Sequence, residues 1–204
     1  MLQMNIPPTP MLRKPYSPLS RVAFTGGMCC GKTYAANLLV NSLGYAKIGF
    51  ADKLKEILKD LYGVTTKNGS GRELLQQFSA DCKRWDPDVW IKHLLLKVQQ
   101  LETADYSLAG IVVDDLRYLK EAEALKNNGF YIIRVDTPPE VQQLRVARLY
   151  PQTSTEALQH DSETEWHRIE PDGIISGVGA YTEADIDSLF KLPKQYSLFD
   201  LADA

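Results

Sequence analysis

The segment between residues 26 and 33 constrains the fold of this chain more than any other. It reads Gly26-Gly27-Met28-Cys29-Cys30-Gly31-Lys32-Thr33: a glycine, four variable residues, and then Gly-Lys-Thr. The residues before it, 21–25, predict a short buried strand, and residues 34–43 predict a helix that stops at Gly44. A glycine-rich loop between a strand and a helix is the context in which this pattern binds phosphate groups.

The chemistry of such a loop suits a polyphosphate. The glycines allow the backbone amides to turn inward, and the start of the helix adds a partial positive charge. Lys32 can bridge the outer phosphates, and the Thr33 hydroxyl can ligate Mg²⁺. The alternative is a glycine turn that precedes a helix by chance, and it would have to match every fixed position and both flanks. We therefore expect the chain to bind a nucleoside triphosphate.

The rest of the chain alternates strands with helices. Further strands are predicted at 46–50, 111–113, 131–135 and 173–176, with helices at 53–62, 72–83, from 87, 119–127, after 139 and at 182–190. This alternation predicts an α/β fold with a five-stranded parallel sheet and helices on both faces. Two helices between residues 72 and 101, with no strand between them, predict an inserted helical block. Trp85 and Trp90 in this block are expected in the core.

Polar residues mark three of the predicted helix starts. Asp52 is expected at the N-cap of the helix that follows it. Thr137 with Glu140, and Ser162 with Glu165, fit the spacing of a capping box.

Composition limits the class of protein. The net charge of −3 and a pI near 5.7 argue against a general nucleic-acid coat, which would carry a basic excess. No apolar run approaches the roughly 20 residues that span a bilayer. Residues 1–20 are rich in proline and predict a flexible arm. The three cysteines are an odd number, and we expect them to be reduced thiols of a cytosolic protein.

Ligands of parallel α/β sheets lie at the carboxyl ends of the strands. That rule brings together the loop, Asp52, residues 114–117 and the segment after Ser176. There, Asp115 can hold Mg²⁺ directly or through water, and Arg117 can take an anionic oxygen; the alternative is a surface Asp–Arg turn. Asp114 should point the other way, since side chains alternate along a strand.

Two arginines predict a lid. Arg145 and Arg148 lie three residues apart on one helical face, before a polar segment at 150–161. They can close over transferring phosphates and exclude water, or they can form a solvated stripe. Polar residues also open the helical block, where a second substrate would lie: Arg72, Gln76 and Gln77. The three histidines lack zinc-ligand spacing with the cysteines.

With these residues in place, the chain resembles the bacteriophage deoxynucleoside monophosphate kinases, a branch of the P-loop nucleotide kinases. The likeness runs from Val22 to about Ser188. It rests on the loop, 50–56, Arg72 with 74–76, Trp90, 115–117 with Glu121, Arg145 and Arg148, 162–163 and 172–175. The chain departs from the family at 176–179, where Ser-Gly-Val-Gly replaces Asn, a small residue and Gly. It also has two acidic residues at 114–115 where the family has one.

The resemblance implies a three-layer P-loop kinase fold and transfer of the ATP γ-phosphoryl group to a deoxynucleoside 5′-monophosphate, with Mg²⁺. The catalytic residues would be Lys32, Asp115, Arg117, Arg145 and Arg148. ATP would be bound by Gly26, Gly27, Met28, Cys29, Cys30, Gly31, Lys32, Thr33, Tyr34, Arg145 and Gly177. The acceptor would be bound by Asp52, Lys53, Arg72, Gln76, Trp90 and Arg117, and the metal by Thr33 and Asp115.

The resemblance also implies an organisation. A kinase domain would span 21–192, with an acceptor-binding helical block at about 52–105, a lid at about 145–165 and a tail at 193–204. The partners would be ATP and a deoxynucleoside monophosphate, without membrane or general nucleic-acid binding. A homodimer is compatible with the sequence, and the location would be the cytoplasm, of the host cell if the protein is phage-encoded.

Three other functions stay open on the sequence. One is another small-molecule kinase on the same scaffold, such as one acting on dephospho-coenzyme A or phosphomevalonate. The second is a nucleotide-dependent switch, although the chain lacks an Asn-Lys-x-Asp signature and an Asp-x-x-Gly after the third strand. The third is a kinase of nucleic-acid ends or modified bases, which the acidic pI disfavours.

Overall fold

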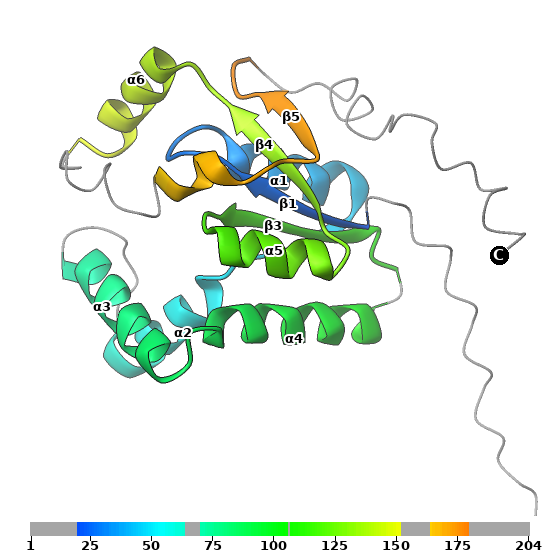
Figure 1. Cartoon of the computed structure of the whole chain (residues 1–204), viewed down its shortest axis with the longest axis vertical. Helices are drawn as coiled ribbons and strands as arrows, with labels where there is room; N and C mark the ends of the chain where they lie inside the picture. Colours follow the sequence, from blue (N-terminus) through cyan, green and yellow to red (C-terminus); the bar gives the residue numbers. More distant parts are fainter. Residues whose placement is uncertain (1–19, 64–69, 106, 152–163, 180–204) are drawn as a thin grey trace, which may run out of the picture.

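The computed structural model describes residues 20–63, 70–105, 107–151 and 164–179. Its strands form one parallel sheet in the order β2-β3-β1-β4-β5 (Figure 1). The strands are β1 (Arg21–Thr25), β2 (Tyr45–Ile48), β3 (Gly110–Leu116), β4 (Tyr131–Asp136) and β5 (Gly173–Ser176). The predicted five-stranded parallel sheet is therefore confirmed.

The helices cover both faces of the sheet. They are α1 (Lys32–Leu43), α2 (Asp52–Tyr62), α3 (Ser70–Trp85), α4 (Val89–Ala104), α5 (Leu119–Asn127) and α6 (Pro139–Leu149), with a 3₁₀ helix, η1 (Glu165–Arg168). Helix α1 packs on one face, whereas α2, α4 and α5 pack on the other. None of the helices in the described ranges is both long and apolar enough to cross a membrane.

The central strand β1 contributes to both cores because its side chains alternate between the faces. Val22 and Phe24 point to α1, where they pack with Leu39. Ala23 points to the opposite core, which contains Val113. The β1 residues of both cores have no exposed surface, so the strand that leads into the loop is fixed from both sides.

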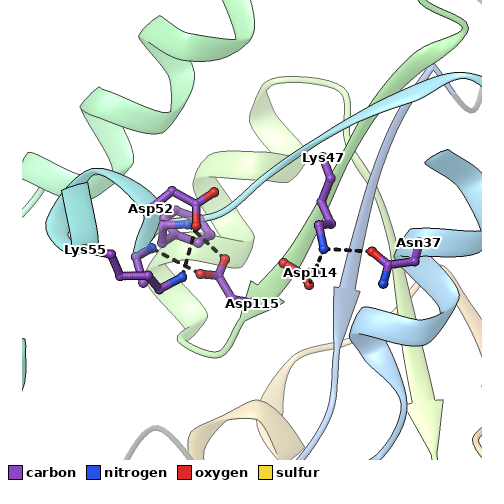
Figure 2. Close-up of polar contacts among 8 residues, drawn as sticks. Asn37, Lys47, Asp52, Lys55, Asp114 and Asp115 are labelled. Atoms are coloured by element: carbon purple, nitrogen blue, oxygen red, sulfur yellow. Dashed lines mark hydrogen bonds and ion pairs between the residues drawn. The ribbon is translucent and has the colours of Figure 1, made fainter. Parts of the chain in front are cut away.

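Strand β3 contains a bulge where its two acidic residues lie. Ala23 pairs with Val113 and Thr25 pairs with Leu116, so a single β1 residue faces both Asp114 and Asp115. The extra residue lets Leu116 return to the same core as Val113, three positions away instead of two. The two carboxylates point to different neighbours, as expected (Figure 2).

Three of the predicted helix starts are wrong. Ala51 holds the N-cap position of α2, and Asp52 is the first helical residue, with no side-chain cap. Helix α4 begins at Val89, two residues later than the predicted start at residue 87. Pro138 precedes α6, because the Thr137 hydroxyl is used elsewhere.

Further expectations about the helical block and the carboxyl-terminal part have mixed outcomes. Trp90 is buried at 6% exposure, whereas Trp85 is 93% exposed at the end of α3, so the assignment of Trp85 to the core is wrong.

Glu165 accepts from the Leu119 amide at 2.9 Å, and its predicted partner Ser162 lies outside the described residues. The helix expected at 182–190, the tail, most of the lid and nearly all of the N-terminal arm also lie outside them.

Candidate active site

The loop between β1 and α1 has an unusual backbone. Gly26 has a φ of 139° and Gly31 a φ of 112°, which glycine adopts without penalty. Cys29 has a φ of 59° and is the one non-glycine residue with positive φ in the described ranges. Such a conformation costs a residue with a side chain about 1–2 kcal/mol, and strain of this kind is typical of functional sites. Helix α1 starts without a side-chain cap, so its first amides suit an anion.

Lys32 folds back onto this loop. Its Nζ donates to the carbonyl oxygens of Gly26 and Gly27, each at 2.7 Å, and lies 3.6 Å from Sγ of Cys30. The side chain is only 6% exposed. The ammonium group is thus held against the loop backbone at the start of α1, where a phosphate on the helix N-terminus would meet it.

Three side chains from the β4–α6 region hold the outer side of the loop. They donate to three consecutive carbonyl groups: Thr137 to Cys30 at 2.7 Å, Gln142 to Met28 at 2.6 Å, and Arg145 to Cys29 at 3.3 Å. Because each peptide unit is planar, fixing its carbonyl also fixes the direction of the neighbouring amide. The loop is therefore braced by a separate part of the chain.

Arg145 also links the loop to the end of β5. Its second terminal nitrogen donates to the Gly177 carbonyl at 2.8 Å. A Cβ at residue 177 would overlap the Cys30 carbonyl and the Thr137 hydroxyl, so glycine is required for this approach. A cavity of about 580 Å³ opens beside the contact, lined by Asp136, Thr137, Pro138, Trp166, Ile174, Ile175 and Ser176.

On the other side of β1, Asp115 turns toward the segment after β2. Its Oδ1 accepts the Phe50 amide at 2.9 Å and its Oδ2 accepts the Ala51 amide at 3.1 Å. Burial raises the pKa of this carboxyl above its usual range, and the two amide hydrogen bonds oppose that rise. Arg117 follows, half-buried, and its amide donates to Glu121 at 3.2 Å.

Glu121 is a buried carboxyl group with a strongly perturbed pKa. It is 7% exposed, and burial, assisted by the nearby charge of Asp115, raises its pKa to about 7. Oε2 accepts the amides of Arg117 and Tyr118, at 3.2 and 3.3 Å. The group thus carries a proton at mildly acidic pH while it holds the start of α5.

This pKa predicts that stability falls as pH rises. The folded pKa lies above the ordinary value of 4.5, so the folded state binds the proton more tightly, and the advantage is lost between about pH 4.5 and 7. The shift corresponds to about 3 kcal/mol. Glu121→Gln should remove this slope, because an amide oxygen still accepts both backbone bonds and cannot ionise.

Urea unfolding at pH 5, 6, 7 and 8, without nucleotide, measures the effect. The variant should gain on the wild type between pH 5 and 7, and the difference should change little between pH 7 and 8. Glu123→Gln, an exposed position on the same helix, is the matched control and should follow the wild type. Parallel curves for Glu121→Gln and the wild type would contradict the assigned pKa.

Other residues that the sequence predicts to bind the acceptor lie on α2 and α3. Asp52 is exposed and pairs with Lys55 at 3.0 Å, and Lys53 pairs with Glu56 at 3.0 Å. Gln76 is exposed on α3, which also carries Arg72. A second cavity, of about 220 Å³, is lined by Lys83, Pro87, Trp90, Ile91, Tyr118, Lys120, Glu121 and Glu165.

The predicted lid arginines differ from each other. Arg145 is half-buried and contacts the loop, whereas Arg148 is exposed, and its side chain has no hydrogen bond or ion pair with any residue of the described ranges.

Thr33 is exposed at the start of α1, as a metal ligand there would be. The part of the chain that the structure describes contains no group of three or more His, Cys, Asp or Glu side chains arranged for a metal. The metal-binding roles of Thr33 and Asp115 stay predictions.

Comparison with known proteins gives one sequence relative. No family model matches the chain. A protein of Acanthamoeba polyphaga mimivirus, described as "Putative deoxynucleotide monophosphate kinase", is 27% identical over 143 residues, which are 57% of this chain and 74% of that protein.

Solved structures show the same fold. TT1252 from Thermus thermophilus superposes with a TM-score of 0.55 at 18% identity, over 85% of this chain and 95% of that one. A sugar kinase from Janibacter sp. HTCC2649 gives 0.52 at 16% identity, over 84% and 92%. At such identities the likeness concerns the fold alone, a parallel α/β sheet with helices on both faces.

Proposed function

We propose that this protein is a kinase that transfers the γ-phosphoryl group of ATP to a deoxynucleoside 5′-monophosphate. The proposed phosphotransferase activity is inferred from the loop of residues 26–33. Lys32 folds onto this loop, and side chains of the β4–α6 region bind its carbonyl groups from the outer side. The mimivirus relative, named as a deoxynucleotide monophosphate kinase, supports the acceptor class.

On the donor side, the loop amides and the first turn of α1 would hold the ATP phosphates, with Tyr34 beside them. Lys32 would move from the carbonyls of Gly26 and Gly27 onto the outer phosphates, which offer it a full negative charge. Mg²⁺ would be held by Thr33 together with phosphate oxygens, and it would neutralise charge that develops on the phosphates. The adenine would lie in the open cavity of about 580 Å³ beside Gly177.

On the acceptor side, the chain presents polar groups at the ends of β2 and β3. Arg117 would take the acceptor phosphate, because a guanidinium can bind two phosphate oxygens at once. Asp52 and Lys53 would bind from the start of α2, and Arg72 and Gln76 from α3. Trp90 lines the second cavity and would form its floor, held there by the hydrogen bond of its indole nitrogen to Ser79 at 3.0 Å.

The chemistry needs no general base. A phosphate monoester has a second pKa near 6, so the attacking oxygen is already an anion at neutral pH. The barrier comes from bringing two polyanions together in line, and the protein would lower it with Lys32, Arg117, Arg145 and Arg148. Each of these residues carries a positive charge.

A panel of acceptors tests the proposal directly. Purified protein would be incubated with γ-labelled ATP, Mg²⁺ and each of four deoxynucleoside monophosphates. Their ribose counterparts, dephospho-coenzyme A, phosphomevalonate and an oligonucleotide with a free 5′-hydroxyl would complete the panel. We expect label in at least one deoxynucleoside diphosphate, with a kcat/KM at least about tenfold above the ribose counterpart. Label in another acceptor alone, or in none, would overturn the acceptor class.

A further inference from the structure

Asp115 presents both carboxylate oxygens to the backbone of the segment that leads into α2. Phe50 and Ala51 donate their amides to Oδ1 and Oδ2 respectively, at 2.9 and 3.1 Å (Figure 2). These two residues precede α2, and Ala51 holds its N-cap position. One side chain from β3 thus accepts hydrogen bonds from two successive backbone amides of a segment about 65 residues away in sequence.

Gly49 makes this contact possible. A Cβ at residue 49 would lie 2.7 Å from Oδ2 of Asp115 and 3.0 Å from its Cγ. Its backbone does not require glycine by conformation, because its φ is outside the positive range. The missing side chain therefore serves the approach of the carboxylate, because the three atoms nearest to that Cβ all belong to Asp115.

The bulge in β3 directs Asp114 and Asp115 to different neighbours. Asp114, one residue earlier, lies 3.7 Å from Lys47, whose Nζ also contacts Asn37 of α1 at 2.8 Å (Figure 2). The extra residue in β3 separates the two carboxylates and directs Asp115 toward the end of β2. Figure 2 shows Asp115 against the start of α2, near Asp52 and Lys55.

We propose that Asp115 is a positioning residue for the acceptor: its carboxylate fixes the turn of Gly49, Phe50 and Ala51, and so sets where α2 presents Asp52 and Lys53. The inference rests on the proposed function for the identity of the acceptor. It is a different role from the metal binding expected from the sequence, and it rests on one amide hydrogen bond to each oxygen of Asp115. Phe50 is buried in the core, and the Asp52 amide closes the turn on the Gly49 carbonyl at 3.2 Å. Asp115 adds the two bonds that tie this turn to β3.

Two variants break the same contact in different ways. Asp115→Asn has the same shape, but its amide nitrogen carries hydrogens and cannot accept from the second backbone amide. Gly49→Ala keeps the carboxylate and pushes it off the turn. Asp114→Asn is the matched control, since it removes a neighbouring carboxylate without touching the turn.

Amide hydrogen exchange by NMR and steady-state kinetics are measured on all four proteins. Asp115→Asn and Gly49→Ala should each speed exchange at Phe50 and Ala51 by at least about tenfold. Both should raise the acceptor KM about tenfold, with the ATP KM and the Mg²⁺ concentration for half-maximal rate within about twofold of wild type. Asp114→Asn should leave exchange at the two amides unchanged.

Each contrary result is decisive. Unchanged exchange in Asp115→Asn, or an unchanged acceptor KM despite faster exchange, would overturn the positioning role. A raised Mg²⁺ requirement in Asp115→Asn that Gly49→Ala does not share would show a metal ligand instead. If the wild type phosphorylates no deoxynucleoside monophosphate, the proposed function fails, and the exchange data still decide whether Asp115 holds the turn.

Discussion

Lys32→Ala is expected to lower kcat by two to three orders of magnitude. The ammonium group is held against the loop backbone by two carbonyl oxygens at 2.7 Å, so it is already beside the place where charge would develop on the migrating phosphoryl group. Removing one such preorganised donor typically costs about 10²–10³ in kcat, or about 3–4 kcal/mol of transition-state stabilisation. The KM for ATP should change less than kcat, because the loop amides and α1 would still hold the phosphates.

Folding must be separated from catalysis in this experiment. Lys32 is buried and makes hydrogen bonds, so its loss should also cost about 1–2 kcal/mol of stability. Thermal unfolding of the variant gives that cost, and turnover is then measured well below its Tm. Lys97→Ala, at an exposed position on α4, is the matched control and should keep wild-type turnover. Turnover of Lys32→Ala within about threefold of wild type would refute the phosphate-loop assignment.

Arg145→Ala and Arg148→Ala should have different kinetic signatures, although the two arginines lie on one helix. Arg145 ties the Cys29 carbonyl to the Gly177 carbonyl, so its loss should loosen the loop and the proposed adenine side together. We expect an ATP KM raised by about tenfold and a kcat lowered by about tenfold to a hundredfold. Arg148 is exposed, so its loss should lower kcat alone, through a contact made when the site closes.

Steady-state kinetics with varied ATP distinguish the two variants. Gln143→Ala, exposed on the same helix, should behave as the wild type and controls for changes in α6 itself. An unchanged ATP KM in Arg145→Ala would mean that its bonds to the loop do not matter for donor binding. An unchanged kcat in Arg148→Ala would mean that this side chain faces solvent throughout the reaction.

The sequence predicts the loop and the sheet well because both depend on local signals. Glycines at 26 and 31 and the apolar residues of β1 are readable without knowledge of distant contacts. The helix starts are harder to predict, since an N-cap signal competes with tertiary contacts. Thr137 illustrates this: its hydroxyl bonds the Cys30 carbonyl, 107 residues away, instead of capping α6.

The missed features of the site share one cause. Gln142 braces the Met28 carbonyl, yet a glutamine on a helix surface carries no signal that a loop 114 residues away needs a donor. The Asp114–Asp115 pair was visible as a doublet, but the bulge that separates its members depends on the pairing of β3 with β1. Gly49 could have suggested a close approach of another side chain, although its partner could not be identified from local sequence.

The strand order affects how the chain folds during its synthesis. The strand before the phosphate loop, β1, has β3 and β4 as its sheet neighbours, and Val22 pairs with Val112 and with Tyr131. During synthesis β1 leaves the ribosome long before either neighbour, and its apolar residues stay without a sheet partner until about 90 further residues are made. The strand that leads into the phosphate loop is thus synthesised early, and its sheet is completed late. Such non-local pairing slows folding and exposes apolar strands to aggregation, so expression at low temperature or with chaperones should raise the soluble yield.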